Sequence, residues 1–228
     1  MKKWLEKLFG TFFPPVEEEP VDPVIKQKED FLAFDGKLEV IIVSDNHEAK
    51  EGLQDVLHQH PNADYYFHCG DSNLSSDLDL MKPFITVSGN TDYDYDYHDN
   101  EWCVLSSGDR IWMTHGHAYS VNRSTEGLVE SAIPDAELVI PIKYRTARTS
   151  IILYGHTHLV DVKMEKGLLI INPGSIALPR GGTFIRSYAR LEITPEVYKI
   201  QIKNAKDHTI VEEFQFPREW RQPDRAPE

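Results

Sequence analysis

The chain has only two cysteines in 228 residues, and it contains no apolar run long enough to cross a membrane. Cys69 and Cys103 lie in apolar segments and form no Cys-x-x-Cys pair. We therefore expect reduced core thiols, as in a cytoplasmic protein, rather than a disulfide framework or a thiolate metal site. A transmembrane helix needs about 18 or more consecutive apolar residues. The sequence thus predicts a soluble protein with no transmembrane segment.

Positive charge is also scarce, with 24 Lys and Arg against 37 Asp and Glu, which gives a formal net charge of −13. Broad binding to nucleic acid depends on basic surface that neutralises phosphates, so this balance argues against it. A site for one phosphorylated ligand would have to supply its own local positive charge. The hydrophobic content of 40% is enough for one globular domain.

The N-terminal region differs in composition from the rest. Residues 1–36 are predicted to be an amphipathic segment followed by an acidic, proline-rich linker, residues 37–216 the folded domain, and residues 217–228 a tail. Residues 1–13 carry apolar and charged side chains in alternation and lack the pattern of a signal peptide. Two interpretations of this segment stay open, a frayed helix and a weak docking contact with a membrane or a protein.

The hydrophobic pattern of the folded part changes from mixed to all-β along the chain. Strands are expected at 38–43, 65–69, 84–87, 102–105, 110–113 and 151–154, with helices at 48–60 and, in two pieces, at 121–147. From 161 to 216 the pattern shows five strand-like segments with no helix between them. The fold class predicted is α/β, with two packed β-sheets flanked by helices.

Polar side chains that can bind metals follow the predicted strands. The turns are Asp45-x-His47, Gly70-Asp71, Gly89-Asn90, His115-Gly116-His117 and Gly155-His156-Thr157-His158. Ligands of α/β sheets bind at the carboxyl ends of the strands, so these turns are expected to meet. Oxygen and nitrogen donors without a thiolate suit Mn, Fe, Zn, Ni or Mg. Each turn alone has an ordinary explanation as a loop cap or a solvated turn, and only the ordered series is specific.

The order of these turns, followed by Asn172-Pro173-Gly174-Ser175, resembles the calcineurin-like metallophosphoesterases. It is most similar to their small, minimal-domain phosphodiesterase branch, which also includes the retromer scaffold subunit. The resemblance covers about residues 37–216. It implies a four-layer α/β/β/α sandwich that holds two divalent metal ions, with Mn expected first and Ni, Zn, Fe or Mg as alternatives.

The same resemblance implies a dinuclear-metal phosphoric ester hydrolase acting on a small phosphoester. A water or hydroxide bridging the two ions would attack phosphorus. By position, Asp45, His47 and His158 would hold the first ion, Asn90, His115 and His156 the second, and Asp71 would bridge both. The amide of Asn90 is also expected to contact the substrate. All these positions carry the residue type that the resemblance requires.

One position departs from the pattern of many larger relatives. Thr91 stands where they carry a histidine that protonates the leaving group, and a threonine hydroxyl is a poor acid near neutral pH. His117 or His68 could supply the proton, or the substrate could have a leaving group that needs little help. His117 could instead support the metal ligands from outside.

Three further features have open interpretations. Arg180 follows the Asn-Pro-Gly-Ser turn and either contacts a substrate phosphate or is simply solvated. Asp92 is a candidate hydrogen-bond partner for a metal-binding histidine. The acidic, tyrosine-rich segment 92–99 is either a solvated loop or a rim that repels polyanions and stacks on an aromatic group.

A second function class also stays open. The fold could serve as a non-catalytic interaction scaffold with a residual metal site, as the retromer relative suggests. The complete ligand set favours the enzyme. The chain has no Gly-x-Ser-x-Gly elbow, which argues against a serine nucleophile. The physiological substrate, the native metal and the oligomeric state do not follow from the sequence.

Overall fold

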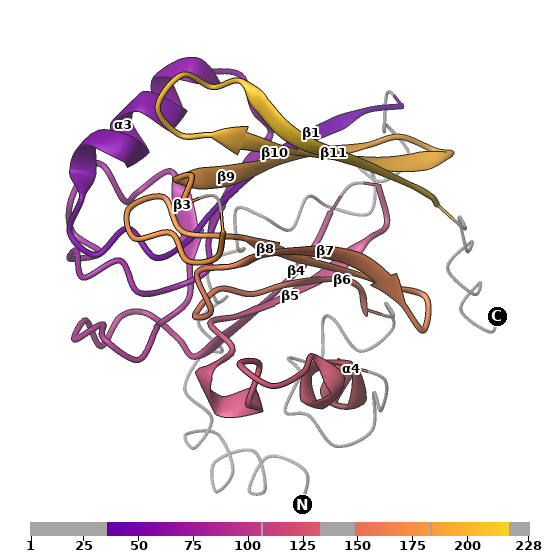
Figure 1. Cartoon of the computed structure of the whole chain (residues 1–228), viewed down its shortest axis with the longest axis horizontal. Coiled ribbons are helices and arrows are strands. Elements are labelled where there is room, and N and C mark those ends of the chain that lie inside the picture. Colours follow the sequence, from indigo (N-terminus) through magenta and orange to yellow (C-terminus); the bar gives the residue numbers. More distant parts are fainter. Residues whose placement is uncertain (1–35, 106, 133–148, 183, 219–228) are drawn as a thin grey trace, which may run out of the picture.

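The computed structural model describes residues 36–105, 107–132, 149–182 and 184–218, which form two β-sheets packed face to face (Figure 1). The predicted amphipathic segment 1–13, the second part of the predicted helical stretch 121–147 and residues 219–228 of the tail lie outside the described residues. Among the residues that are described, no helix is both long and apolar enough to cross a membrane.

Each sheet mixes parallel and antiparallel strands. The first sheet has the order β11-β10-β9-β1-β2-β3, and the second has the order β4-β5-β6-β8-β7. The strands of the first sheet are β1 (Leu38–Val43), β2 (Tyr65–His68), β3 (Phe84–Thr86), β9 (Ser187–Ile193), β10 (Val197–Asn204) and β11 (Ile210–Pro217). Those of the second are β4 (Asn100–Val104), β5 (Arg110–Thr114), β6 (Thr149–Leu153), β7 (Val160–Glu165) and β8 (Leu168–Pro173).

Strand β1 shows why these residues form a buried central strand. Val40 and Ile42 point into the core between the sheets, whereas Ile41 and Val43 point to the outer face of the first sheet. Helix α3 (Lys50–Gln59) covers that outer face (Figure 1). A strand buried on both faces needs apolar residues on each face, and all residues of this strand except the half-buried Glu39 are apolar. The prediction of a strand at 38–43 is confirmed.

Helix α4 (Glu126–Ala132) covers the outer face of the second sheet (Figure 1). Leu128 and Val129 belong to the same buried cluster as Trp112 and Ile152 of strands β5 and β6. With α3 on the opposite outer face, this completes two packed sheets flanked by helices. The predicted fold class is therefore confirmed.

Several element boundaries differ from the sequence-based expectation, among them the start of the helix expected from residue 121, which begins at Glu126, and two of the differences lie beside the polar turns or a cavity. Helix α3 begins at Lys50 rather than at residue 48, because His47 and Glu48 have φ values of 42° and 68° that a right-handed helix cannot contain. Strand β9 begins at Ser187 rather than at residue 184, because Phe184 also has a positive φ of 50°. Both departures occur where turns carry polar side chains or line a cavity.

The chain remains packed slightly beyond residue 216. Strand β11 ends at Pro217, and buried Arg218 forms an ion pair with Asp109 at 3.0 Å. Cys69 and Cys103 are buried and form no disulfide with each other, which agrees with the expectation of two core thiols.

Candidate metal centre

The polar turns meet because of how the two sheets are built. Strands β1, β2 and β3 are parallel neighbours in the first sheet, and β5, β6 and β8 are parallel neighbours in the second. Parallel neighbours end at the same edge, so their turns lie side by side. The turn after β1 is bonded to the turn after β2 by the Asp45 N–H, which donates to the Gly70 carbonyl at 3.1 Å.

A first cluster contains Asp45, His47 and His158, whose ligand atoms all lie within 4.8 Å of one another. Nε2 of His158 lies 3.3 Å from Nε2 of His47 and 3.2 Å from Oδ1 of Asp45. The Nδ1 atoms of both rings form hydrogen bonds outside the cluster. Nδ1 of His47 lies 3.1 Å from Oδ1 of Asn73, and Nδ1 of His158 donates to the Leu178 carbonyl at 2.5 Å.

These contacts fit a bound cation. With both Nδ1 atoms committed as donors, the two Nε2 atoms face each other with lone pairs, an arrangement that a positive charge between them would stabilise. Oδ1 of Asp45 is buried and accepts no hydrogen bond from the described residues. The Asp45 carboxylate also raises the pKa of His158 despite partial burial. The cluster therefore favours positive charge at its centre.

A second cluster contains Asn90, His115 and His156. Oδ1 of Asn90 lies 3.2 Å from Nε2 of His115 and 2.9 Å from Nδ1 of His156. His115 is fully buried, and its Nδ1 donates to the Cys69 carbonyl at 2.7 Å, so its Nε2 faces the cluster. Nε2 of His156 lies 3.0 Å from the side-chain nitrogen of Asn122.

Asp71 lies between the two clusters. Its Oδ2 is 3.3 Å from Nε2 of His115 and 4.0 Å from Nε2 of His47. Its Oδ1 accepts the Thr91 N–H at 2.8 Å. Burial raises the pKa of Asp71, but His115 and the Thr91 N–H lower it more, so the net pKa is well below the usual range. The carboxylate is thus ionised and has neighbours on both sides.

The imidazoles respond unequally to these charges. Burial opposes protonation of His115, yet the neighbouring carboxylates of Asp71 and Asp45 raise its pKa. Burial and the charge of His115 lower the pKa of both His156 and His117. Positive charge is therefore stabilised at the buried centre and disfavoured at its rim.

The backbone of the turns is held in an uncommon conformation. Positive φ values, which cost non-glycine residues about 1 kcal/mol or more, occur at Asp45 (54°), His47 (42°), Asp71 (54°), His156 (69°) and His158 (60°). The Asn-Pro-Gly-Ser turn helps to hold them. Ser175 Oγ donates to the Asp45 carbonyl at 2.7 Å, and the Asn172 amide donates to the Gly155 carbonyl at 2.7 Å. The sequence motif identified this turn, but only the structure shows that its side chains hold the backbone of the ligand turns.

Glycine is required where two of the turns touch. A Cβ at Gly89 would lie 2.2 Å from Oδ1 of Asp71 and 2.3 Å from the Asp71 backbone nitrogen. A Cβ at Gly155 would lie 2.1 Å from Ser44 Oγ. Side chains cannot approach that closely, so these glycines allow the clusters to form.

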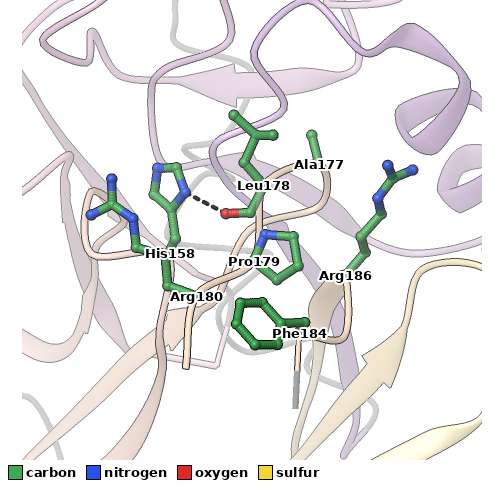
Figure 2. Close-up of a pocket in the computed structure, with 7 residues that line it drawn as sticks. All are labelled: His158, Ala177, Leu178, Pro179, Arg180, Phe184 and Arg186. Atoms are coloured by element: carbon green, nitrogen blue, oxygen red, sulfur yellow. Dashed lines mark hydrogen bonds between the residues drawn. The ribbon is translucent and has the colours of Figure 1, made fainter. Parts of the chain in front are cut away.

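His117 and Arg180 lie at the edge of the centre. The exposed ring of His117 is centred 5.6 Å from that of His115 and 6.3 Å from that of His156. Arg180 is exposed and lines a cavity together with His158 (Figure 2). His117 therefore lies beside the second cluster, and Arg180 lies beside the first.

Two sequence-based hypotheses need correction. His68 is fully buried, its Nε2 lies 2.8 Å from Oδ1 of Asn46, and its Nδ1 accepts the Gly70 N–H. It cannot reach a substrate, so the hypothesis that it protonates a leaving group is wrong. Asp92 accepts the backbone N–H groups of Asn73 and Gly89 at 2.6 and 2.8 Å rather than a histidine N–H. It fixes the loop conformation instead.

The buried His68 leads to a pH-dependent stability. Burial lowers its pKa to about 4, while the pKa of a histidine in the unfolded chain is about 6.5. As pH falls through this window the unfolded state binds the proton more readily, so His68 destabilises the fold progressively. The full loss corresponds to roughly 3 kcal/mol. In metal-free protein, urea unfolding between pH 7 and pH 4.5 is expected to show a smaller loss of stability for His68→Gln than for the wild type. Parallel pH profiles would contradict this assignment.

The sequence matches a family model over most of this region. Residues 38–196 match the calcineurin-like phosphoesterase superfamily domain. A Bacillus subtilis (strain 168) protein named "Probable metallophosphoesterase YsnB" is 33% identical over 147 residues, which are 63% of this chain and 78% of that protein.

Solved structures agree with this match. A conserved Streptococcus pneumoniae TIGR4 protein, described as a predicted phosphoesterase, is 31% identical with a TM-score of 0.69, covering 80% of this chain and 98% of that one. Vacuolar Protein Sorting 29 from Cryptosporidium parvum shares the fold at 15% identity, with a TM-score of 0.62 over 81% of this chain and 100% of that one. The chain belongs to the calcineurin-like phosphoesterase superfamily.

Proposed function

We propose that this chain is a metal-dependent phosphodiesterase that hydrolyses a small phosphoester. The observation that carries the proposal is the meeting of two ligand clusters where strands of both sheets end, with the ionised Asp71 carboxylate between them. Family membership supports a metal-binding phosphoester hydrolase. We infer the use of two ions from the set of ligand side chains. We infer the preference for diesters from the poor acids available to protonate the leaving group.

The two clusters would each hold one divalent ion. The ligands proposed are Asp45, His47 and His158 for the first ion, Asn90, His115 and His156 for the second, and Asp71 for both. Two such ions would polarise a phosphoryl oxygen and lower the pKa of water. We favour Mn, which accepts carboxylate, amide and imidazole donors. Zinc is the main alternative, since a related fold, Vacuolar Protein Sorting 29 from Entamoeba histolytica, has been solved in complex with Zn²⁺.

The protein side chains would orient the substrate. Oδ1 of Asn90 faces His115 and His156, which leaves its NH₂ group to donate to a phosphate oxygen. As a neutral amide it adds no charge that would repel the phosphate. The hydrogen bonds from Nδ1 of His115 and His158 to backbone carbonyls fix the ring orientations and tautomers. Arg180 would attract the phosphate from the rim.

The side chains near the leaving group are poor acids for its protonation. Thr91 Oγ1 donates to Oδ1 of Asn73 at 3.2 Å and is a poor acid near neutral pH. His117 is the candidate acid, but burial and the charge of His115 lower its pKa, so it is mostly unprotonated at pH 7. The site is therefore suited to leaving groups that depart without a proton.

This geometry predicts a preference among substrates. Because general acid catalysis contributes roughly 100-fold or more, Mn²⁺-loaded protein is expected to hydrolyse bis(p-nitrophenyl) phosphate at least about 100-fold more efficiently than an alkyl phosphomonoester such as glycerol 3-phosphate. Steady-state kcat/KM values check this, with chelator-treated protein as the blank. Similar values for the two esters would mean that an efficient general acid acts at the site.

The same assay tests the scaffold alternative. Structural similarity to Vacuolar Protein Sorting 29, at 15% identity, shows the fold alone. A pure scaffold would give no metal-dependent turnover with any phosphoester. The proposed enzyme is expected to give turnover that disappears with chelator and returns with Mn²⁺.

A further inference from the structure

A cavity of about 500 Å³ opens beside the first metal cluster (Figure 2). Its lining residues are His158, Ala177, Leu178, Pro179, Arg180, Phe184 and Arg186. Two hydrogen bonds connect the cavity wall to the proposed metal ligand His158. Nδ1 of His158 donates to the Leu178 carbonyl, and the Arg180 N–H donates to the His158 carbonyl at 3.1 Å. A ligand whose phosphate sits at the metal centre could therefore extend into this cavity.

The cavity has an apolar surface that is open to solvent. Leu178 is 55% exposed and Phe184 is 72% exposed, and Pro179 lies between them in Figure 2. Phe184 also adopts a positive φ of 50°, which is rare for a bulky residue, and strained positions of this kind cluster at functional sites. Exposed apolar side chains gathered beside a polar centre are typical of a ligand site.

Two arginines flank this apolar surface. Figure 2 shows the guanidinium group of Arg180 on the side of His158 and that of Arg186 on the opposite side of Pro179 and Phe184. Both residues are exposed, and among the described residues no carboxylate forms an ion pair with either one. In a chain with a net charge of −13 they concentrate positive charge at one cavity. Guanidinium groups bind phosphate and carboxylate through paired hydrogen bonds.

We propose that this cavity selects phosphoesters that carry an apolar or aromatic group and, beyond it, a second anionic group bound by Arg186. The inference rests on the proposed function, because the reacting phosphate would lie at the metal centre. Phe184 and Leu178 would contact the organic part of the substrate. Arg180, on the side of His158, would face the reacting phosphate, which leaves Arg186 as the residue that sets specificity.

The test uses a matched pair of substrates, the p-nitrophenyl esters of thymidine 5′-phosphate with either a free 3′-hydroxyl or a 3′-phosphate. The wild type is expected to favour the 3′-phosphorylated ester by about 10-fold in kcat/KM, as one charge-assisted contact would give. Arg186→Gln is expected to remove most of that preference, and Arg186→Lys to keep part of it. Lys166→Gln, which removes an exposed cation from the turn between β7 and β8, is the matched control and keeps the preference.

A binding measurement separates this inference from the proposed function. With Mn²⁺ present, calorimetry is expected to show tighter binding of thymidine 3′,5′-bisphosphate than of thymidine 5′-phosphate to the wild type but not to Arg186→Gln. Equal preferences in the two proteins, in rates and in binding, would overturn the role of Arg186 even if hydrolysis occurs. Binding that depends on Arg186 without any hydrolysis would overturn the phosphodiesterase and leave the anion site intact. The variants should fold, because the contact of Arg186 with Ala205 is made by its backbone carbonyl.

Discussion

Asp71→Asn is expected to lower kcat/KM for bis(p-nitrophenyl) phosphate by at least about 100-fold and to reduce the metal bound after loading. Oδ2 of Asp71 faces both His115 and His47, and an asparagine places there either a neutral amide oxygen or an NH₂ group, which are both poorer ligands for a cation than a carboxylate oxygen. The substitution also removes the negative charge that lies between the two clusters. Loss of an outer partner of a metal ligand already costs about 10–100-fold, and loss of a shared ligand should cost more. Kinetics and elemental analysis of one preparation measure both effects.

Asp77→Asn is the matched control for this substitution. Asp77 follows the same strand but is exposed, and its replacement removes the same charge away from the clusters. Its rate and metal content are expected to equal those of the wild type. Wild-type metal content and activity in Asp71→Asn would show that Asp71 is not a shared ligand.

Gly89→Ala is expected to have a comparable effect without removing any ligand. The new methyl group would lie 2.2 Å from Oδ1 of Asp71 and 2.3 Å from its backbone nitrogen, so either the Gly89 turn or Asp71 must move. A displacement of about 1 Å at a catalytic group can cost roughly 100-fold in rate. Overpacking of this kind also lowers the free energy of unfolding by about 1–3 kcal/mol. Hydrolysis, metal content and thermal unfolding of the variant check these expectations.

Gly182→Ala serves as the control for the glycine substitution. A Cβ at Gly182 meets no atom within 4 Å, so the added methyl group lies in open space. This variant is expected to keep the wild-type rate with bis(p-nitrophenyl) phosphate. If Gly89→Ala behaved in the same way, the close approach of this turn to Asp71 would have no part in building the site.

The sequence predicted the parts of the fold that depend on local pattern. The hydrophobic pattern predicted a strand at 38–43, and β1 spans these residues with apolar side chains on both of its faces. The polar turns were expected to converge because parallel strands end at a common edge, and the distances around Asp71 show that these turns do meet. Both inferences rest on periodicity and strand direction, which a single sequence carries.

The residues that support the site could not be predicted in this way. Asn73 faces Nδ1 of His47, and Asn122 faces Nε2 of His156, yet neither belongs to a recognisable motif. His68 was one of the two candidate acids, but its ring lies inside the protein. Such roles depend on where distant segments pack, and hydrophobic periodicity contains no information about them.

The charge near the cavity was partly visible from the sequence. Arg180 stood close to a recognised turn, whereas Arg186 and Phe184 lay in a segment expected to be the beginning of a strand. Because β9 begins only at Ser187, these two residues are free to line the cavity instead of joining the sheet. The difference between the expected and observed strand start is thus what creates the proposed specificity site.

The most direct test of this account is the position of metal in crystals of the Mn²⁺-loaded wild type. Anomalous scattering is expected to show two peaks about 3.5–4 Å apart, one among Asp45, His47 and His158 and the other among Asn90, His115 and His156, with Asp71 between them. Anomalous maps without a peak at these side chains, from crystals of protein that hydrolyses phosphodiesters, would contradict it.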